Sequence, residues 1–149
     1  MIIELPDEAA TGVLAGRIAA ALQPGDVVAL EGTLGAGKTT LARAIVAALG
    51  YQGEVPSPSF AIIEVYEPPQ VRVPLVHADF YRLDDPAEVE ELGLDDYRQG
   101  AAMIAEWPEN AGGFVREPAC LSIRIEILEK GRRAIVEPGR DWLERGGWI

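Results

Sequence analysis

The chain has 149 residues, of which 48% are hydrophobic and 25% are charged. This composition is typical of a globular protein, and the length suits one domain at the usual size of about 100–200 residues, so we expect a single domain over residues 1–149. Thirteen Lys and Arg against 24 Asp and Glu give a formal net charge of -11, which disfavours direct binding to nucleic acid or anionic lipid. One cysteine, Cys120, excludes an internal disulfide and a multi-cysteine zinc site. With no signal-like segment and no apolar run of about 20 residues, we expect a reduced, cytoplasmic protein without membrane attachment.

The N-terminal third of the sequence predicts a strand, a helix, a second strand and a second helix. The opening segment IIELPDEAAT is expected to begin with a short strand, and Asp7 is placed to cap a helix that ends at Pro24 and Gly25. The apolar positions of this helix recur at helical spacing: Val13, Leu14, Ile18 and Leu22. Residues 26–31 are an apolar run of buried-strand length, and a glycine-rich loop separates them from a helix over residues 41–49.

The remainder predicts further strands, one short acidic helix and a hairpin. Strands are expected over residues 60–66, 73–80 and 101–107, and an acidic helix begins near Asp85 as its N-cap. Alternating residues 121–128 and 133–138 predict a hairpin, followed by a short helix and a frayed end. Strands interleaved with helices favour an α/β fold with helices on both faces of a mixed, mostly parallel sheet.

The glycine-rich segment Gly32–Thr39, GTLGAGKT, fits the phosphate-binding pattern G-x-x-x-x-G-K-S/T. In this pattern the backbone N–H groups of the turn, here at Gly35, Ala36 and Gly37, surround the phosphates at a helix N-terminus. Lys38 is expected to reach the β and γ phosphates, and the Thr39 hydroxyl to coordinate Mg²⁺. The pattern follows an apolar strand and precedes a helix, which is the context that such a loop requires.

Hydrolysis of a nucleoside triphosphate also needs an acidic group near the metal, and two carboxylates end apolar strands. Asp79 and Glu106 are therefore candidate magnesium ligands and catalytic residues, although either could be a solvated strand-end carboxylate. The sequence leaves open which of them contacts Mg²⁺ directly. His77 is interpreted as a packing residue rather than a base, and Trp107 as either a core residue or an exposed anchor.

Several strings of this sequence together resemble the TsaE family, small bacterial ATPases of tRNA threonylcarbamoyladenosine biosynthesis. These strings are LPDEAAT, LGAGKTTLAR, VPSPSF, HADFYRLDDPAEVEELGLDDY, IAEWPE and a Gly-Arg pair at 131–132. They follow the family's order from about residue 4 to 133. The resemblance implies a three-layer P-loop NTPase fold, ATP and Mg²⁺ as cofactors, and an ATPase that assists a separate threonylcarbamoyl transferase heterodimer of the TsaD–TsaB type.

The resemblance also implies roles for individual positions. Beside Lys38 and Thr39, it matches Thr40 to a second hydroxyl, Ser59 to a switch-loop hydroxyl, Asp79 and Glu106 to an acidic pair, and Trp107 to the adjacent aromatic residue. Arg132 lies in the basic cluster 130–133, and one of its arginines could reach phosphate or face solvent. The family commonly has Asp where Thr33 stands and Thr where Ser59 stands, so an acidic contact from the phosphate loop is in doubt.

Other classes of nucleotide-binding protein compete with this interpretation. A GTPase is disfavoured because the chain has neither an N-K-x-D nor a D-x-x-G string. A small-molecule P-loop kinase stays possible, although no long arginine-rich lid is present. The third alternative is a nucleotide-dependent interaction module that hydrolyses nothing.

Overall fold

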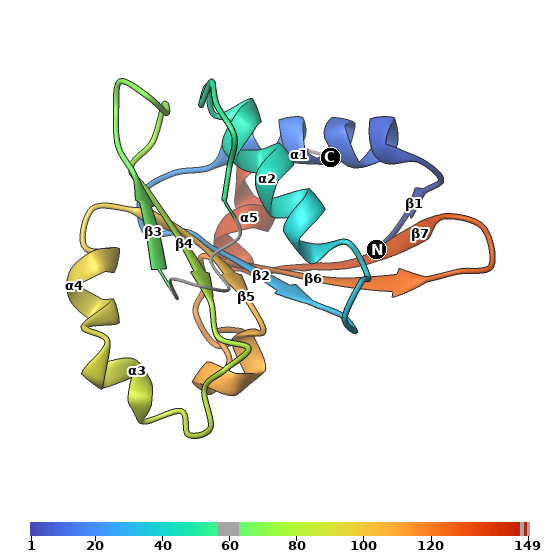
Figure 1. The fold of residues 1–149 in the computed structure, drawn as a ribbon. Coiled ribbons are helices and arrows are strands. Elements are labelled where there is room, and N and C mark those ends of the chain that lie inside the picture. Colours follow the sequence, from blue (N-terminus) through green and yellow to red (C-terminus); the bar gives the residue numbers. More distant parts are fainter. Residues whose placement is uncertain (57–62, 147, 149) are drawn as a thin grey trace.

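The structure, a computed structural model, describes residues 1–56, 63–146 and 148. Strands of these residues form one seven-stranded sheet in the order β1-β7-β6-β2-β5-β4-β3 (Figure 1). The strands are β1 (Ile2–Leu5), β2 (Val27–Glu31), β3 (Ile63–Tyr66), β4 (Leu75–Asp79), β5 (Ala102–Glu106), β6 (Cys120–Ile127) and β7 (Arg132–Pro138). The helices are α1 (Glu8–Ala21), α2 (Lys38–Ala48), α3 (Glu88–Glu91), α4 (Leu94–Arg98), the 3₁₀ helix η1 (Pro108–Ala111) and α5 (Arg140–Arg145).

The four central strands β4, β5, β2 and β6 are parallel to one another, and the reversed strands lie outside them. β3 pairs antiparallel with β4 at one edge, and β7 pairs antiparallel with both β6 and β1 at the other. The hairpin predicted near Lys130 and Gly131 is the β6–β7 pair. The expected α/β fold with a mixed, mostly parallel sheet is therefore confirmed.

Each face of the sheet is covered by its own set of helices, which gives three layers. α1 and α2 lie together on one face, where Ile18 and Ile45 pack with Val28 and Leu30 of β2. On the other face, residues of α3, α4 and η1 pack with the alternate side chains of β2, β4 and β5. β2 is buried on both faces, which explains why its sequence is continuously apolar rather than alternating.

The carboxyl ends of three parallel strands meet at one edge of the sheet. Glu106 at the end of β5 pairs in register with Leu30 of β2 and with Asp79 of β4. The phosphate loop leaves β2 at the same edge and leads into α2. In open α/β sheets ligands bind at this edge, so the topology brings the separate sequence motifs together there.

Three local expectations differ from the structure. Val13 is 57% exposed, because the buried face of α1 carries smaller residues together with Leu14 and Ile18. Asp85 does not cap a helix; its carboxylate accepts a bond from Ala87 N, and α3 begins only at Glu88. The chain end is not frayed at Trp148, which is buried and packs edge-on against Trp142 of α5.

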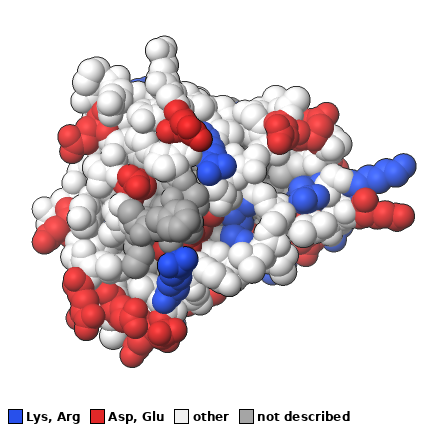
Figure 2. Space-filling view, viewed as in Figure 1, with Lys and Arg blue, Asp and Glu red and all other residues white. Residues whose placement is uncertain are grey.

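The surface carries its acidic side chains unevenly. Figure 2 shows red groups gathered at the lower left of the view, where Figure 1 has α3 and α4. The exposed residues of this region include Asp84, Asp85, Glu90, Glu91 and Asp95.

None of the helices in the described part of the chain combines the length and the apolar character that a membrane crossing needs.

Candidate functional site

The phosphate loop is a tight turn that only glycine fits at several positions. Gly35 and Gly37 have φ angles of +78° and +111°, which side chains with a Cβ rarely adopt. Gly32 packs so closely that a Cβ there would lie 2.7 Å from the carbonyl oxygen of Ile125 in β6. α2 then begins at Lys38, so its first N–H groups and its positive dipole end face the loop.

Lys38 is buried at the centre of this loop. Its ammonium donates to the carbonyl oxygens of Gly32 and Thr33 at 2.6 and 2.9 Å. It also lies 4.3 Å from the centroid of the Trp107 ring. Burial lowers the pKa of Lys38 from its ordinary value, while the carboxylates of Glu106, Glu109 and Asp79 oppose that shift. An anionic ligand beside this ammonium would favour its charged form.

Glu106 joins two residues from different elements through its two oxygens. The Thr39 hydroxyl of α2 donates to Oε1 at 2.7 Å, and Nε2 of His77 in β4 lies 2.7 Å from Oε2. Glu106 is 1% exposed and His77 is fully buried. The carboxylate is therefore held by hydrogen bonds on both sides, as a buried charge requires.

Asp79 lies beside Glu106 in the sheet register and is half-buried. Its Oδ1 accepts a hydrogen bond from Tyr81 N at 2.9 Å, which orients the side chain at the start of the following loop. Burial raises the pKa of Asp79, with Glu106 raising it further and the Tyr81 bond lowering it. The strand end thus presents two carboxylates, one fully buried and one accessible.

Trp107 adopts a left-handed backbone conformation, with φ of +56°, directly after β5. This turn starts η1 and directs the indole back over Lys38. The Tyr81 ring lies 5.0 Å from the Trp107 ring, and Tyr81 is 46% exposed. A non-glycine residue in this conformation costs about 1–3 kcal/mol, and such strain concentrates at functional sites.

Two cavities flank the phosphate loop and share Gly35, Gly37 and Thr40 in their walls. The first has a volume of about 380 Å³, and the second of about 270 Å³. The first is also lined by Lys38, Thr39, Asp79, Glu106, Trp107, Leu34, Tyr81 and Arg82. The second is also lined by Leu5, Pro6, Asp7, Glu8, Thr11, Ala36, Ile125, Gly131 and Arg132.

Arg132 reaches the phosphate loop from β7. Its Nε donates to the carbonyl oxygen of Ala36 at 3.1 Å, and Nη2 lies 3.4 Å from that of Gly35. Gly131 lets the hairpin approach so closely that a Cβ there would lie 2.9 Å from Pro6 Cα. The arginine is thus directed at the loop rather than into solvent.

Most of the side chains singled out in the sequence lie around this loop. Lys38, Thr39, Asp79, Glu106 and Trp107 share the first cavity, whereas Arg132 lines the second. Ser59 and its neighbour Ser57 lie outside the described residues.

Sequence reasoning missed four residues in or beside the first cavity, as well as most of the residues that line the second. His77 was interpreted as packing only, and Leu34, Tyr81 and Arg82 were not considered as lining residues. His77 could have been found from its position two residues before Asp79, which was already a candidate. Residues two apart on a strand point to the same face, so His77 faces the same side of the sheet as Asp79.

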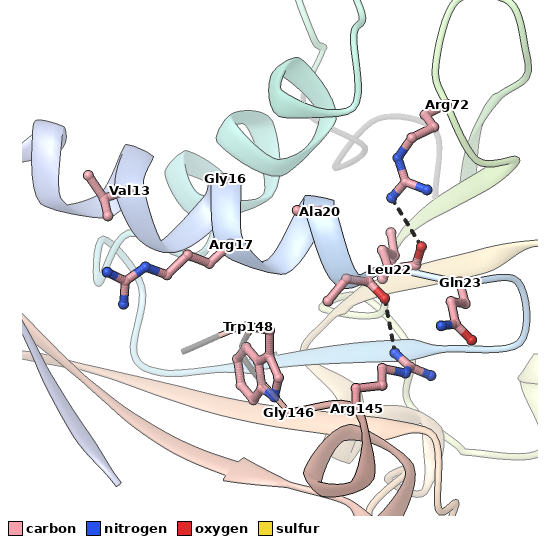
Figure 3. Close-up of a pocket in the computed structure, with 11 residues that line it drawn as sticks. Val13, Gly16, Arg17, Ala20, Leu22, Gln23, Arg72, Arg145, Gly146 and Trp148 are labelled. Atoms are coloured by element: carbon pink, nitrogen blue, oxygen red, sulfur yellow. Dashed lines mark hydrogen bonds between the residues drawn. The ribbon is translucent and has the colours of Figure 1, made fainter.

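A further cavity of about 660 Å³ lies at the carboxyl end of α1 (Figure 3). Arg72 donates there to the carbonyl oxygens of Ala19 and Leu22, and Arg145 donates to that of Ala21. Arg145 also pairs with the buried Asp26. These arginines satisfy the last carbonyls of α1, so this cavity belongs to the framework and not to the phosphate loop.

Cys120 is buried, and desolvation raises the pKa of its thiol to about 12, which makes it unreactive. Within residues 1–56, 63–146 and 148, no group of three or more His, Cys, Asp or Glu side chains could hold a metal ion. A metal at the phosphate loop would therefore need ligands from water and a bound phosphate.

Comparison with known proteins identifies the family. Residues 5–135 match the family model described as threonylcarbamoyl adenosine biosynthesis protein TsaE. The chain is 44% identical over 115 residues to the tRNA threonylcarbamoyladenosine biosynthesis protein TsaE of Streptomyces coelicolor, covering 76% of each chain. It is 33% identical over 130 residues to that of Rickettsia felis, covering 87% of this chain and 74% of the relative.

A solved structure agrees with the sequence matches. The crystal structure of Bacillus subtilis YdiB superimposes with a TM-score of 0.75 at 30% identity, covering 97% of this chain and 89% of the other. Together with the P-loop NTPase-type fold, these matches show that the chain belongs to the TsaE family of tRNA threonylcarbamoyladenosine biosynthesis proteins.

Proposed function

We propose that this protein binds ATP with Mg²⁺ at the phosphate loop and hydrolyses it in support of the threonylcarbamoyl modification of tRNA adenosine. The observation that carries the proposal is the 2.7 Å hydrogen bond between Thr39 and Glu106. It joins the hydroxyl expected at the metal to a strand-end carboxylate, beside the buried ammonium of Lys38. Phosphoryl transfer to water needs these three kinds of group in one place.

The first cavity suits the triphosphate. Its wall carries Gly35 and Gly37 of the glycine-rich turn, the start of α2 and the Lys38 ammonium, and the helix start and the ammonium both favour an anion. A Cβ at Gly35 or Gly37 would meet no atom within 4 Å, so the space beside the loop backbone is open. In this proposal Lys38 leaves its loop carbonyls to contact the β and γ phosphates.

The donor set of this cavity fits Mg²⁺. Thr39, Glu106 and Asp79 offer a hydroxyl and two carboxylates, which are the oxygen ligands that this hard cation prefers. The ion usually keeps several waters and binds phosphate oxygens, so few protein ligands suffice. When bound, it would neutralise charge on the phosphates. Thr39 would then give up its bond to Glu106.

The second cavity suits the nucleoside. It lies across Gly35, Gly37 and Thr40 from the first, so one elongated ligand can occupy both. Leu5, Pro6 and Ile125 provide apolar surface for a base, and Asp7 and Thr11 provide polar groups. Arg132, which bonds to the loop carbonyls, adds positive charge to the wall of the second cavity.

The carboxylates are proposed to divide the chemistry. Glu106 orients or deprotonates the attacking water, and Asp79 supports Mg²⁺ from the more accessible side of the cavity. Trp107 lies over Lys38 and the Tyr81 ring lies beside Trp107, so the two rings would exclude water from bound phosphates. These roles explain why the strand ends carry acids although the cavity is proposed to bind an anion.

The partner is proposed to be the TsaD–TsaB type transferase heterodimer. The net charge of -11 opposes direct tRNA binding, so this chain would act through a protein complex. Leu34 and Tyr81 are 66% and 46% exposed at the mouth of the first cavity. A partner that contacts them can respond to the nucleotide, because those side chains border the same cavity.

The test is ATP turnover with water as the acceptor, measured with and without the purified heterodimer. We expect slow release of phosphate by the chain alone, faster release with the heterodimer, and co-purification of the complex only with ATP. Phosphate transfer to a small-molecule acceptor would instead support a P-loop kinase. Tight nucleotide binding without any hydrolysis would support an interaction module.

A second experiment tests whether the partner docks beside the first cavity, where Trp107 lies. Trp107→Ala should weaken ATP-dependent co-purification more than it changes the melting temperature, and Val115→Ala, at an exposed apolar residue away from the first cavity, should not. Strong tRNA binding by the chain alone, or equal docking without nucleotide, would contradict the proposal.

A further inference from the structure

His77 is a buried polar residue whose role the phosphate-loop chemistry does not itself explain. It lies in the middle of β4 and is fully buried, although a histidine in such a place loses its contacts with water. Its Nε2 lies 2.7 Å from Oε2 of Glu106. Nδ1 has no hydrogen-bond partner among the described residues. The imidazole therefore makes one polar contact there, and that contact is with Glu106.

The sheet register makes this contact possible. His77 and Asp79 point to the same face of β4, because residues two apart on a strand share a face. Asp79 pairs with Glu106, and His77 pairs with Ile104, two residues earlier on β5. His77 is thus the diagonal neighbour of Glu106 on the adjacent strand, and the two long side chains can reach each other.

The direction of the hydrogen bond follows from the acceptor. A carboxylate oxygen only accepts, so Nε2 carries the hydrogen and donates it to Oε2. Nδ1 can then remain an unpaired acceptor, which is less costly than an unpaired donor N–H. The imidazole is thereby oriented so that it fixes one oxygen of Glu106.

Of the two hydrogen bonds that Glu106 accepts, one would break when Mg²⁺ binds and the other would remain. The bond at Oε1 comes from Thr39, a residue that is proposed to turn to Mg²⁺. The bond at Oε2 comes from His77, which is buried in the sheet and does not line the first cavity. When Thr39 turns away, Oε1 becomes free while Oε2 stays held.

We propose that His77 is a positioning residue, which anchors Oε2 of Glu106 so that the carboxylate presents only Oε1 to the attacking water or the metal. This inference rests on the proposed ATP hydrolysis and adds the group that orients its carboxylate. Without His77, the Glu106 side chain would rotate and present either oxygen. The predicted loss concerns turnover and not nucleotide affinity, because His77 lines neither cavity and its polar contact is with Glu106 rather than with the phosphate loop.

The experiment compares three variants of the full chain. His77→Leu removes the donor at similar volume, and His77→Gln keeps an N–H donor at about the same distance from the backbone. Val76→Ala is the matched control, because Val76 is the buried neighbour on the opposite face of β4. Each variant is measured for kcat and KM of ATP hydrolysis, ATP affinity by calorimetry, and melting temperature.

We expect His77→Leu to lower kcat by about 10–100-fold, the range found when outer hydrogen-bond partners of a site are removed. KM and ATP affinity should stay within about twofold, and His77→Gln should recover most of the lost kcat. Val76→Ala should lower the melting temperature without this loss of kcat. Equal kcat in His77→Leu and the parent, or a glutamine variant as slow as the leucine variant, would overturn the inference.

Crystal structures of the parent and of His77→Leu separate this inference from the proposed function. If the parent fails to hydrolyse ATP in any complex, the proposed function is wrong. The position of the Glu106 side chain in the two structures still tests whether His77 anchors it. A changed Glu106 rotamer in His77→Leu supports the anchoring role, whereas an unchanged rotamer overturns it.

Discussion

Lys38 Nζ lies 4.3 Å from the centroid of the Trp107 ring, so the phosphate-loop cation and the residue after β5 face each other across one cavity. The two residues are far apart in sequence, and the left-handed turn at Trp107 brings them together. The indole and two loop carbonyls replace water around the ammonium. This arrangement explains why the chain tolerates a buried lysine.

Replacing Lys38 by Ala should abolish tight ATP binding, because the ammonium is the cation that the loop offers to the β and γ phosphates. Calorimetric titration with Mg-ATP measures the effect, and a loss of at least about 100-fold in affinity is expected for a buried charge-assisted contact. Lys130→Ala is the control, since Lys130 is exposed in the β6–β7 turn. Unchanged affinity in Lys38→Ala would show that the phosphate-loop assignment is wrong.

Glu106→Gln should keep ATP bound but lose most turnover. The amide retains an oxygen for the Thr39 hydroxyl but lacks the negative charge that activates water. A loss of about 10²–10⁴-fold in kcat is expected from removal of a general base. Phosphate release and ATP affinity are measured on the same preparation, with the exposed Glu129→Gln as control. Full turnover in the glutamine variant would exclude an essential role for the carboxylate.

Asp79→Asn should stabilise the protein at neutral pH, although Asp79 is a proposed magnesium ligand. Burial raises the pKa of Asp79 above its ordinary value of 3.8. At a pH between the ordinary pKa of the unfolded state and the raised pKa of the folded state, the folded state binds more protons than the unfolded state. The free energy of unfolding therefore falls as the pH rises through this window. The asparagine has no such charge, and its Oδ1 can still accept from Tyr81 N.

The measurement for Asp79 is the melting temperature from pH 7 down towards 3.8. The asparagine variant should melt a few degrees above the parent at pH 7, and the difference should shrink as the pH falls. Asp95→Asn, an exposed position in α4, should show no comparable change. A lower melting temperature for Asp79→Asn at pH 7 would contradict the prediction.

Asp26→Asn should destabilise the fold without changing the site. Asp26 is 1% exposed, and both of its oxygens bond to Arg145 at 2.6 Å, with Gln23 N as a further donor. Removing one partner of a buried pair costs about 3–5 kcal/mol, which urea unfolding measures. Glu117→Gln, which breaks the more exposed pair with Arg98, should cost about 1 kcal/mol at most. Equal losses in the two variants would show that the burial of Asp26 is unimportant.

The sequence by itself determined the features that depend on neighbouring residues. The order strand, glycine-rich loop and helix around Lys38 was predicted because loop conformation and helix start are local properties. The same holds for the β6–β7 hairpin and for β2, whose continuous apolar run has the length of a buried strand. The roles predicted for Asp79, Glu106 and Ser59 stay predictions, although two of these residues now have a described environment.

Only the tertiary structure decided which distant residues meet. His77 and Glu106 are 29 residues apart, Thr39 and Glu106 67, and Arg132 and Ala36 96. Each contact depends on strand order and register, which place β5 between β2 and β4 and bring β7 near the loop. These pairings arise from the packing of whole layers, so no short stretch of sequence encodes them. From the sequence alone, His77 was therefore interpreted as a packing residue. Only the pairing of β4 with β5 shows that it contacts the Glu106 carboxylate.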